Sequence, residues 1–228
     1  MQRKTLGEML RRSGSEDIPP CDYSFPSNAT QMVSLLSAFK SAEAGVHISL
    51  AESLLEGDAS AAIALSSMAG VAARQGALLR IHANSNASFA SFETPLSATW
   101  AYNLALGFVQ PGSCPAELPI PTLPVLYLNN ATAGFARPGS SVPFAWGDAG
   151  KAAASRAGKP LFIGWVNQVD APMYTPLTWD HDGFGVTRVP TDLSGTAFAV
   201  LTTQTGLTSV DELTRATLAG PVIVCLVQ

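Results

Sequence analysis

Apolar side chains recur at helical spacing through residues 29–55, with polar side chains between them. The apolar positions are Met32, Leu35, Leu36, Phe39, Val46, Leu50 and Leu54. Such a stripe lies along one side of an α-helix, and the glycine at position 57 follows it as a stop signal. The pattern predicts one long helix, or two helices with a break near Gly45.

Three further helical segments are predicted, one before this segment and two after it in the sequence. Asp58 has the side chain of an N-cap, and apolar residues continue at helical spacing behind it, which predicts a second long helix over residues 58–84. Thr94 followed by Pro95 predicts the start of a third helix, because proline at the first helical position loses no needed donor. Residues 5–12 are typical of the last turns of a helix.

The periodicity changes after a proline-rich stretch at residues 116–124, which prevents a helix from continuing. Short β-rich runs separated by Gly, Asp and Pro follow at residues 125–128, 142–146, 161–166, 185–189, 196–203 and 221–227. We therefore expect an α+β protein. Its helical domain would occupy residues 1–115 and a small immunoglobulin-like β-sandwich residues 125–228, with residues 116–124 as the linker.

Composition excludes several classes of protein. With 47% hydrophobic and 13% charged residues, 228 residues can bury a sizeable core. Thirteen basic against seventeen acidic side chains give no positive stripe for a phosphate backbone, so nucleic acid is not an expected partner. The longest apolar stretch, residues 59–73, is mostly alanine and is shorter than the roughly 20 strongly apolar residues of a membrane span.

Signals of cellular location conflict. The N-terminus begins with positive charge but has no apolar h-region behind it, so the chain as written would be cytoplasmic. Three Asn-x-Ser/Thr sequons, at Asn28, Asn86 and Asn130, point instead to a secreted glycoprotein.

A set of short segments, in order along the chain, resembles one known family. They are CDYSFP (residues 21–26), FETPL (92–96), YNLA (102–105), GSCP (112–115), AFAVLTT (197–203) and AGPVI (219–223). Together they are similar to the fungal Rds1 stress-response proteins, relatives of the bacterial desiccation-related proteins. The resemblance implies a ferritin-like helical bundle joined to a small β domain, here without the family's first helix.

The same resemblance implies that the family's metal site is degenerate. A ferritin-like di-metal site takes a Glu from each of two helices and Glu-x-x-His from each of the other two. No Glu in this chain has a His three residues after it. The family's ligand positions fall on Arg3, Leu6, Ala42, Ala72 and Gln75. No metal or other cofactor is therefore expected.

Two weaker metal candidates remain. Glu43 and His47 stand at i and i+4, where they can share one helix face, although one such pair holds a metal weakly. Residues 179–184 contain a His between two Asp, but Asp182 followed by Gly183 before an extended run is first of all a hairpin turn.

Loss of the metal ligands leaves two structural alternatives for this site, an open pocket or a filled core. Leu6, Val46, Ser49, Gln75 and His82 follow the family's ligand positions around the inward helix faces, so the loss of metal would leave an apolar cavity with few polar points. Such a pocket suits a small apolar ligand. Alternatively, repacking has filled the space and these residues are ordinary core.

Three hypotheses of function follow. The first is a metal-free, stress-response-type protein that binds a small apolar molecule or a protein partner. The second is a metal-independent cyclase or pericyclase, of Diels-Alder type, in fungal secondary metabolism, with Arg3, Gln75 and His82 as donors and Trp100 and Tyr102 as walls. The third is a misassigned start codon, with the missing helix and a signal peptide encoded upstream.

Cysteine usage leaves one question open. Cys21 and Cys114 stand where the family also has cysteines, so the resemblance implies a disulfide, with two reduced, buried thiols as the alternative. Cys225 lies inside a continuous apolar run and is expected to pack as a small hydrophobic residue.

Overall fold

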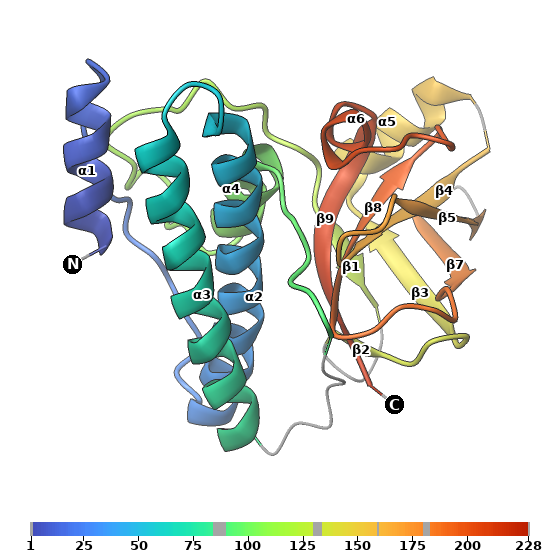
Figure 1. Cartoon of the computed structure of the whole chain (residues 1–228). Helices are drawn as coiled ribbons and strands as arrows, with labels where there is room; N and C mark the ends of the chain where they lie inside the picture. The colour runs from blue at the N-terminus through green and yellow to red at the C-terminus, as the bar shows by residue number, and fades with distance from the viewer. Residues whose placement is uncertain (1, 84–89, 130–133, 159, 180–182, 228) are drawn as a thin grey trace.

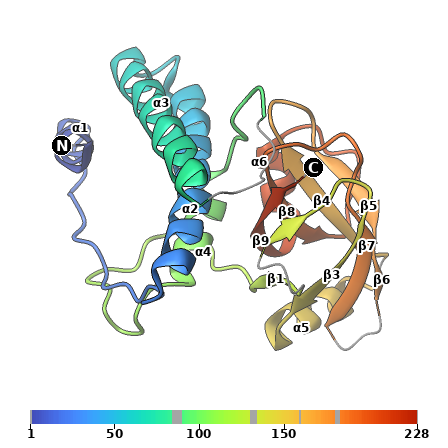
Figure 2. The same ribbon diagram turned by 90° about the horizontal axis from the view of Figure 1, so that it is seen from below.

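The structure is a computed structural model that describes residues 2–83, 90–129, 134–158, 160–179 and 183–227. It contains both helices and strands, as expected for an α+β protein. Helices α1 to α4, here called the helical part, lie on one side of the molecule, and the strands, called the sheet part, lie on the other (Figure 1). The same separation is visible from below in Figure 2.

The helical part is dominated by an antiparallel pair, α2 (Ala29–Leu54) and α3 (Ala59–His82), which confirms both long helices and leaves no break at Gly45. The side chain of Asp58 accepts a hydrogen bond from the Ala61 amide and caps α3 as predicted. The two helices pack through small side chains, and Ala44 and Ala72 are fully buried between them. Helix α1 (Gln2–Arg12) stands on the outer side of this pair (Figure 1).

Helix α4 (Ala98–Leu106) begins later than the sequence predicts. The hydroxyl of Thr94 donates to the Thr196 carbonyl at 2.6 Å and accepts from the Gln168 amide at 2.9 Å. These bonds hold Thr94 against the sheet part, and Ser97 instead caps the helix by accepting from the Trp100 amide. The predicted start at Thr94 is therefore wrong, because long-range hydrogen bonds outweigh the local preference of Pro95.

The sheet part contains two sheets. One has the order β1 (Leu126–Leu128), β3 (Ser141–Trp146), β7 (Phe184–Arg188) and β6 (Thr178–Trp179). The other has the order β2 (Phe135–Ala136), β9 (Thr217–Leu226), β8 (Thr196–Thr202), β4 (Phe162–Asn167) and β5 (Met173–Pro176). All pairings are antiparallel except that of β2 with β9. Helices α5 (Asp148–Ala157) and α6 (Val210–Arg215) connect strands of this part.

Strands lie on both sides of the predicted hairpin turn and pair with each other. Thr178 pairs with Val186 and Trp179 with Gly185 in an antiparallel register. Gly183 has a φ of 82°, a conformation that glycine adopts without steric cost. Asp180, His181 and Asp182 lie outside the described residues, so the alternative metal cluster is not described.

Two apolar cores hold these elements together. The first lies between the two sheets, where the rings of Phe144 and Trp165 meet edge to face with centroids 5.8 Å apart. The second core joins the helical part to the sheet part, which lie on either side of the proline-rich segment in the sequence. It contains Leu96, Trp100 and Phe198. Within it the indole N–H of Trp100 donates to the Thr217 hydroxyl at 3.1 Å.

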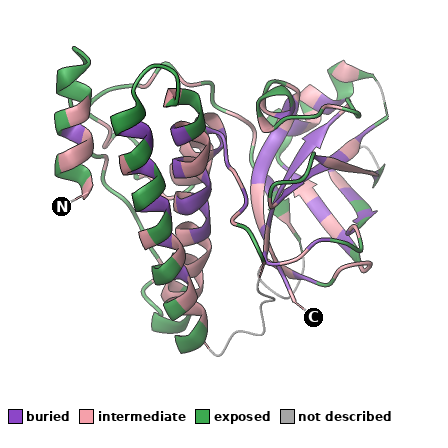
Figure 3. Cartoon of the chain, in the orientation of Figure 1, coloured by how far each residue is buried: buried purple, intermediate pink, exposed green. Residues whose placement is uncertain are grey.

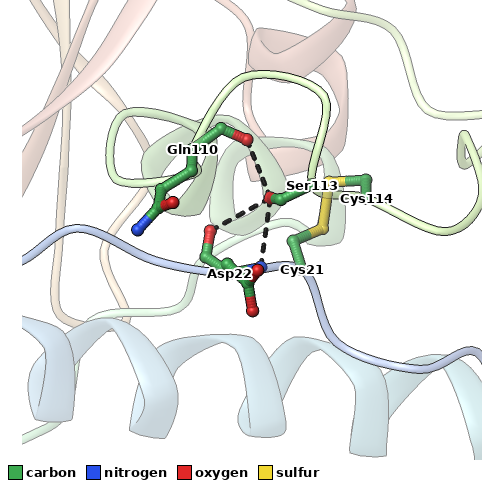
Figure 4. The surroundings of a disulfide bond; sticks show 5 residues. All are labelled: Cys21, Asp22, Gln110, Ser113 and Cys114. Carbon is green, nitrogen blue, oxygen red and sulfur yellow. Dashed lines mark hydrogen bonds between the residues drawn. A yellow bond between two sulfur atoms is a disulfide. The ribbon is translucent and has the colours of Figure 1, made fainter.

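Cys21 and Cys114 form the disulfide that the resemblance implies (Figure 4). Beside it, the Ser113 hydroxyl oxygen accepts from the Asp22 amide at 3.1 Å and lies 2.7 Å from the Gln110 carbonyl. The bond and its neighbours tie the segment before α2 to the segment after α4.

One helix has an exposed apolar side. Ile63, Leu78 and Ile81 of α3 are more than half exposed. Figure 3 shows exposed residues recurring along this helix. Among the described helices α3 alone has the length and apolar composition of a membrane span, although its other face packs along α2. That packing is compatible with a chain that does not span a membrane.

Candidate binding cleft

The residues predicted to surround an emptied metal site do not meet in the structure. Leu6 packs against Ala51, Ala62 and Leu65, near the start of α3. Val46 lines a cavity on the other side of α2, and Ser49 is half-buried. No single cavity is therefore formed by Leu6 and Val46.

Arg3, Gln75 and His82 are exposed, so the prediction that Gln75 and His82 face inward is wrong. The short helix α1 lies beside the first half of α3 only (Figure 1). Gln75 and His82 lie in the second half of α3, which α1 does not reach, and both are exposed there.

The pair Glu43 and His47 lies on α2 but is not arranged as a metal site. The Glu43 carboxylate is bonded to the ammonium group of Lys40. His47 is buried, and its Nδ1 has no hydrogen-bond partner. Burial lowers the pKa of His47, Lys40 adds to that effect and Glu43 opposes it. Within the described ranges, no group of three or more His, Cys, Asp or Glu side chains could hold a metal ion.

A large hollow in the described part of the chain lies at the junction of the helical and sheet parts. We call it the interlayer cleft, and its volume is about 650 Å³. The first half of α2 forms one wall. A second wall comes from α4 and the chain that follows it, as far as Tyr127, and a third comes from β9. The main apolar contributors are Leu35, Phe39, Leu104, Leu123, Val125, Tyr127, Val222 and Ile223.

The burial pattern of β9 explains how a strand can line this cleft. Val224 and Leu226 point into the core between the sheets and are fully buried. Side chains alternate along a strand, so Ile223 and Cys225 point to the opposite face, toward α2. Both faces of β9 are thus apolar, which accounts for the unbroken hydrophobic run that ends the sequence.

The cleft forms where α2 and the sheet part separate. At Gly45 the chain after α3 approaches the helix backbone, and the Gly45 carbonyl accepts from the Leu96 amide at 3.1 Å. A Cβ at position 45 would overlap the Thr94 carbonyl oxygen. About two to three turns earlier, α2 presents Ser34 and Ala38 to the sheet part, and these small side chains leave space.

Aromatic rings separate the interlayer cleft from a second, smaller cavity of about 250 Å³. The rings of Phe39 and Phe108 meet edge to face at 5.0 Å, and both residues line the two spaces. Phe25 lies 5.9 Å from Phe108 and stacks on Tyr23. The nearby disulfide holds the segment that carries Tyr23 and Phe25 over this cavity.

A smaller, polar space adjoins the cleft. A space of about 70 Å³ is lined by Ser37, Ser41, Arg80, Glu93, Thr94 and Thr196, and it shares Ser34, Ala38, Phe135 and Cys225 with the interlayer cleft. We call it the polar end. Burial raises the pKa of Glu93, and the nearby Arg80 opposes that rise. Burial also raises the pKa of the Cys225 thiol to about 11, so it is uncharged at neutral pH.

Two other predicted residues serve elsewhere. Trp100 is fully buried in the core that joins the two parts, so it is not a cavity wall. Tyr102 lines a separate hollow beside the disulfide, of about 180 Å³.

The predicted glycosylation sites differ in what the structure describes. Asn28 is exposed, and its side chain caps α2 by accepting from the Gln31 amide. Asn86 and Asn130 lie outside the described residues.

The chain matches no known family profile and no curated protein. The geometry of the cleft is therefore what indicates a function. Its described titratable side chains are Arg80, Glu93, Tyr127 and Cys225. With apolar walls along most of its length and opposite charges at one end, the cleft is suited to binding.

Proposed function

We propose that the chain binds a small apolar molecule in the interlayer cleft. The observation that carries the proposal is the cleft's size and wall chemistry. Its volume of about 650 Å³ falls within the range of small-molecule pockets, roughly 300–1,000 Å³. Leu35 and Phe39 of α2 lie across it from Ile223 of β9, and burial of an apolar ligand between them is favourable.

The concave shape favours a small molecule over a protein partner. The cleft lies between α2 and α4 on one side and β9 on the other, so only a narrow segment of a second protein could enter it. A protein partner is accordingly the other outcome of the binding test.

We also propose that the chain is a metal-free relative of the fungal Rds1 stress-response proteins, with a partial ferritin-like bundle and an immunoglobulin-like sandwich. The order of helices before strands and the Cys21–Cys114 disulfide support this assignment. Metal analysis of the purified protein is expected to find well under one iron or manganese per chain. Stoichiometric metal would overturn the metal-free assignment.

No observation favours the alternative of a cyclase or pericyclase. Its proposed donors, Arg3, Gln75 and His82, are exposed and do not line the cleft. Preorganised donors act on a reacting molecule only when they face the space that holds it.

The binding proposal is tested with 1-aminoanthracene, an uncharged dye whose emission rises in apolar surroundings. We expect saturable binding, and Leu35→Trp should weaken it by about tenfold or more, because the indole occupies the space that the dye needs. Leu36→Trp is the matched control. Leu36 is the next residue on α2, is 37% exposed and does not line the cleft. Equal binding by the two variants, or none by the native protein, would contradict the proposal.

A further inference from the structure

We infer that the ligand is an amphiphile with an uncharged hydrogen-bonding end group, such as a hydroxyl or a carbonyl, which lies between Arg80 and Glu93 at the polar end. This inference rests on the proposed function, because it concerns the same cleft. It adds the chemical class of the ligand and the direction in which the ligand lies.

The walls that the two spaces share support the direction. Ser34 and Ala38 of α2 and Cys225 of β9 line both the interlayer cleft and the polar end. The polar end therefore lies directly beside the larger space, where the end group of a ligand whose apolar body fills that space would be placed. At about 70 Å³, the polar end has room for a small end group but not for a second apolar body.

The charges at the polar end favour an uncharged group. Arg80 carries a positive charge and Glu93 a negative one, and each is close enough to influence the other. A charged end group would be attracted by one of these side chains and repelled by the other, so the two effects offset each other. It would still lose its water on entering this partly buried space, which an uncharged group does at much lower cost.

A hydroxyl group suits the same surroundings because it both donates and accepts. It can donate to the Glu93 carboxylate and accept from the Arg80 guanidinium, which has five N–H donors. Ser37 and Ser41 add hydroxyls to the lining of the polar end. Cys225 adds no charge, since its thiol remains protonated at neutral pH.

The experiment compares decan-1-ol, decanoate and decylammonium as competitors for bound 1-aminoanthracene at about pH 8, where an ordinary carboxyl is ionised. The three molecules share one alkyl chain and differ in the charge of the end group. We expect decan-1-ol to displace the dye at a concentration about tenfold lower than either ion.

Glu93→Gln gives the sharper result. The substitution keeps the size of the side chain and removes its charge, so Arg80 is no longer offset and decanoate should gain about tenfold relative to decan-1-ol. Glu52→Gln is the matched control, because Glu52 is exposed on α2 and does not line the polar end. Its order of affinities should remain that of the native protein.

The outcomes separate the two proposals. If the dye binds and the three competitors displace it equally, or decanoate displaces it best, the inference about the end group is wrong and the apolar cleft stands. An unchanged order of affinities in Glu93→Gln also overturns it. If the dye does not bind at all, the proposed function fails, and this inference fails with it.

Discussion

The helical part and the sheet part are packed in opposite ways. Between the sheets the core contains large rings, and Phe144, Trp146 and Trp165 are at most 2% exposed. Between α2 and α3 the contact is made by small side chains such as Ala44 and Ala72. Stabilisation by burial grows with the apolar area removed from water, so the sheet core contributes far more for each residue.

This difference explains where the molecule is closed and where it is open. The helix pair cannot gain much from its own interface, so it depends on the core around Leu96 and Trp100 that joins it to the sheet part. Beyond the reach of those side chains, α2 and β9 face each other across a space. The interlayer cleft remains because the large side chains of this core fill only one end of the space between α2 and the sheet part.

The largest expected effect comes from Trp100→Ala. It removes the fully buried ring that joins the two parts, which costs about 3–5 kcal/mol in typical cores. Urea unfolding measures the loss, and hydrogen exchange should show α2 and α3 opening before β8 and β9. Tyr102→Ala, a half-buried position on the same helix, should cost less. Equal losses from the two variants would show that α4 does not join the parts in this way.

Removal of the Cys21–Cys114 disulfide should have the next largest effect on unfolding. The cysteines are 93 residues apart, and closing a loop of that length is worth about 4 kcal/mol in the chain-entropy model. The double variant Cys21→Ser with Cys114→Ser should lose that stability, measured by urea unfolding. A reducing agent should destabilise the native protein and leave the double variant unchanged. If neither treatment matters, the helical part does not need this cross-link.

A pair of glycines on the two long helices sharpens the comparison. Gly45→Ala should destabilise by about 1–3 kcal/mol or more, because its Cβ would overlap the Thr94 carbonyl oxygen where the two parts meet closely. Gly70→Ala should stabilise by roughly 0.5–1 kcal/mol, since a Cβ there meets nothing and alanine favours the helix. Thermal unfolding measures both. Stabilisation by both substitutions would contradict the close approach at Gly45.

The smallest expected effect is the pH dependence that His47 contributes to stability. Its pKa is lowered from 6.5 in the fold, mainly by burial, so the unfolded chain takes up the proton more readily. The stabilisation is therefore complete above the unfolded pKa and is lost as the pH falls below it. Melting temperatures of the native protein and His47→Gln should converge as the pH is lowered from about 7 to 5. Parallel curves would mean that His47 is not buried between the helices.

Local patterns predicted the elements whose stability is local. The spacing of apolar residues located α2 and α3, and Asp58 marked the start of α3. Helix α6 was missed although its sequence carried a signal, because Ser209 and Glu212 form a capping box. Helix α5 was also missed, and its sequence carries a weaker signal, because its N-cap is a glycine without a side-chain hydrogen bond.

Long-range contacts account for what the sequence did not predict. The start of α4 depends on bonds from Thr94 to Gln168 and Thr196, which are distant in the chain. The exposure of Gln75 depends on how far α1 extends along α3. The interlayer cleft combines α2 with β9, at opposite ends of the sequence, and its sequence signal was the apolar run on both faces of β9.

The most direct test of the cleft uses Cys225, which lines it. Cys225 has a free thiol, whereas Cys21 and Cys114 are joined in the disulfide. N-ethylmaleimide adds to the thiolate, and mass spectrometry follows the slow alkylation of the native protein at about pH 8. Saturating 1-aminoanthracene is predicted to slow alkylation by about tenfold, because the dye lies against β9. An unchanged alkylation rate with the dye demonstrably bound would place the ligand elsewhere and contradict the account.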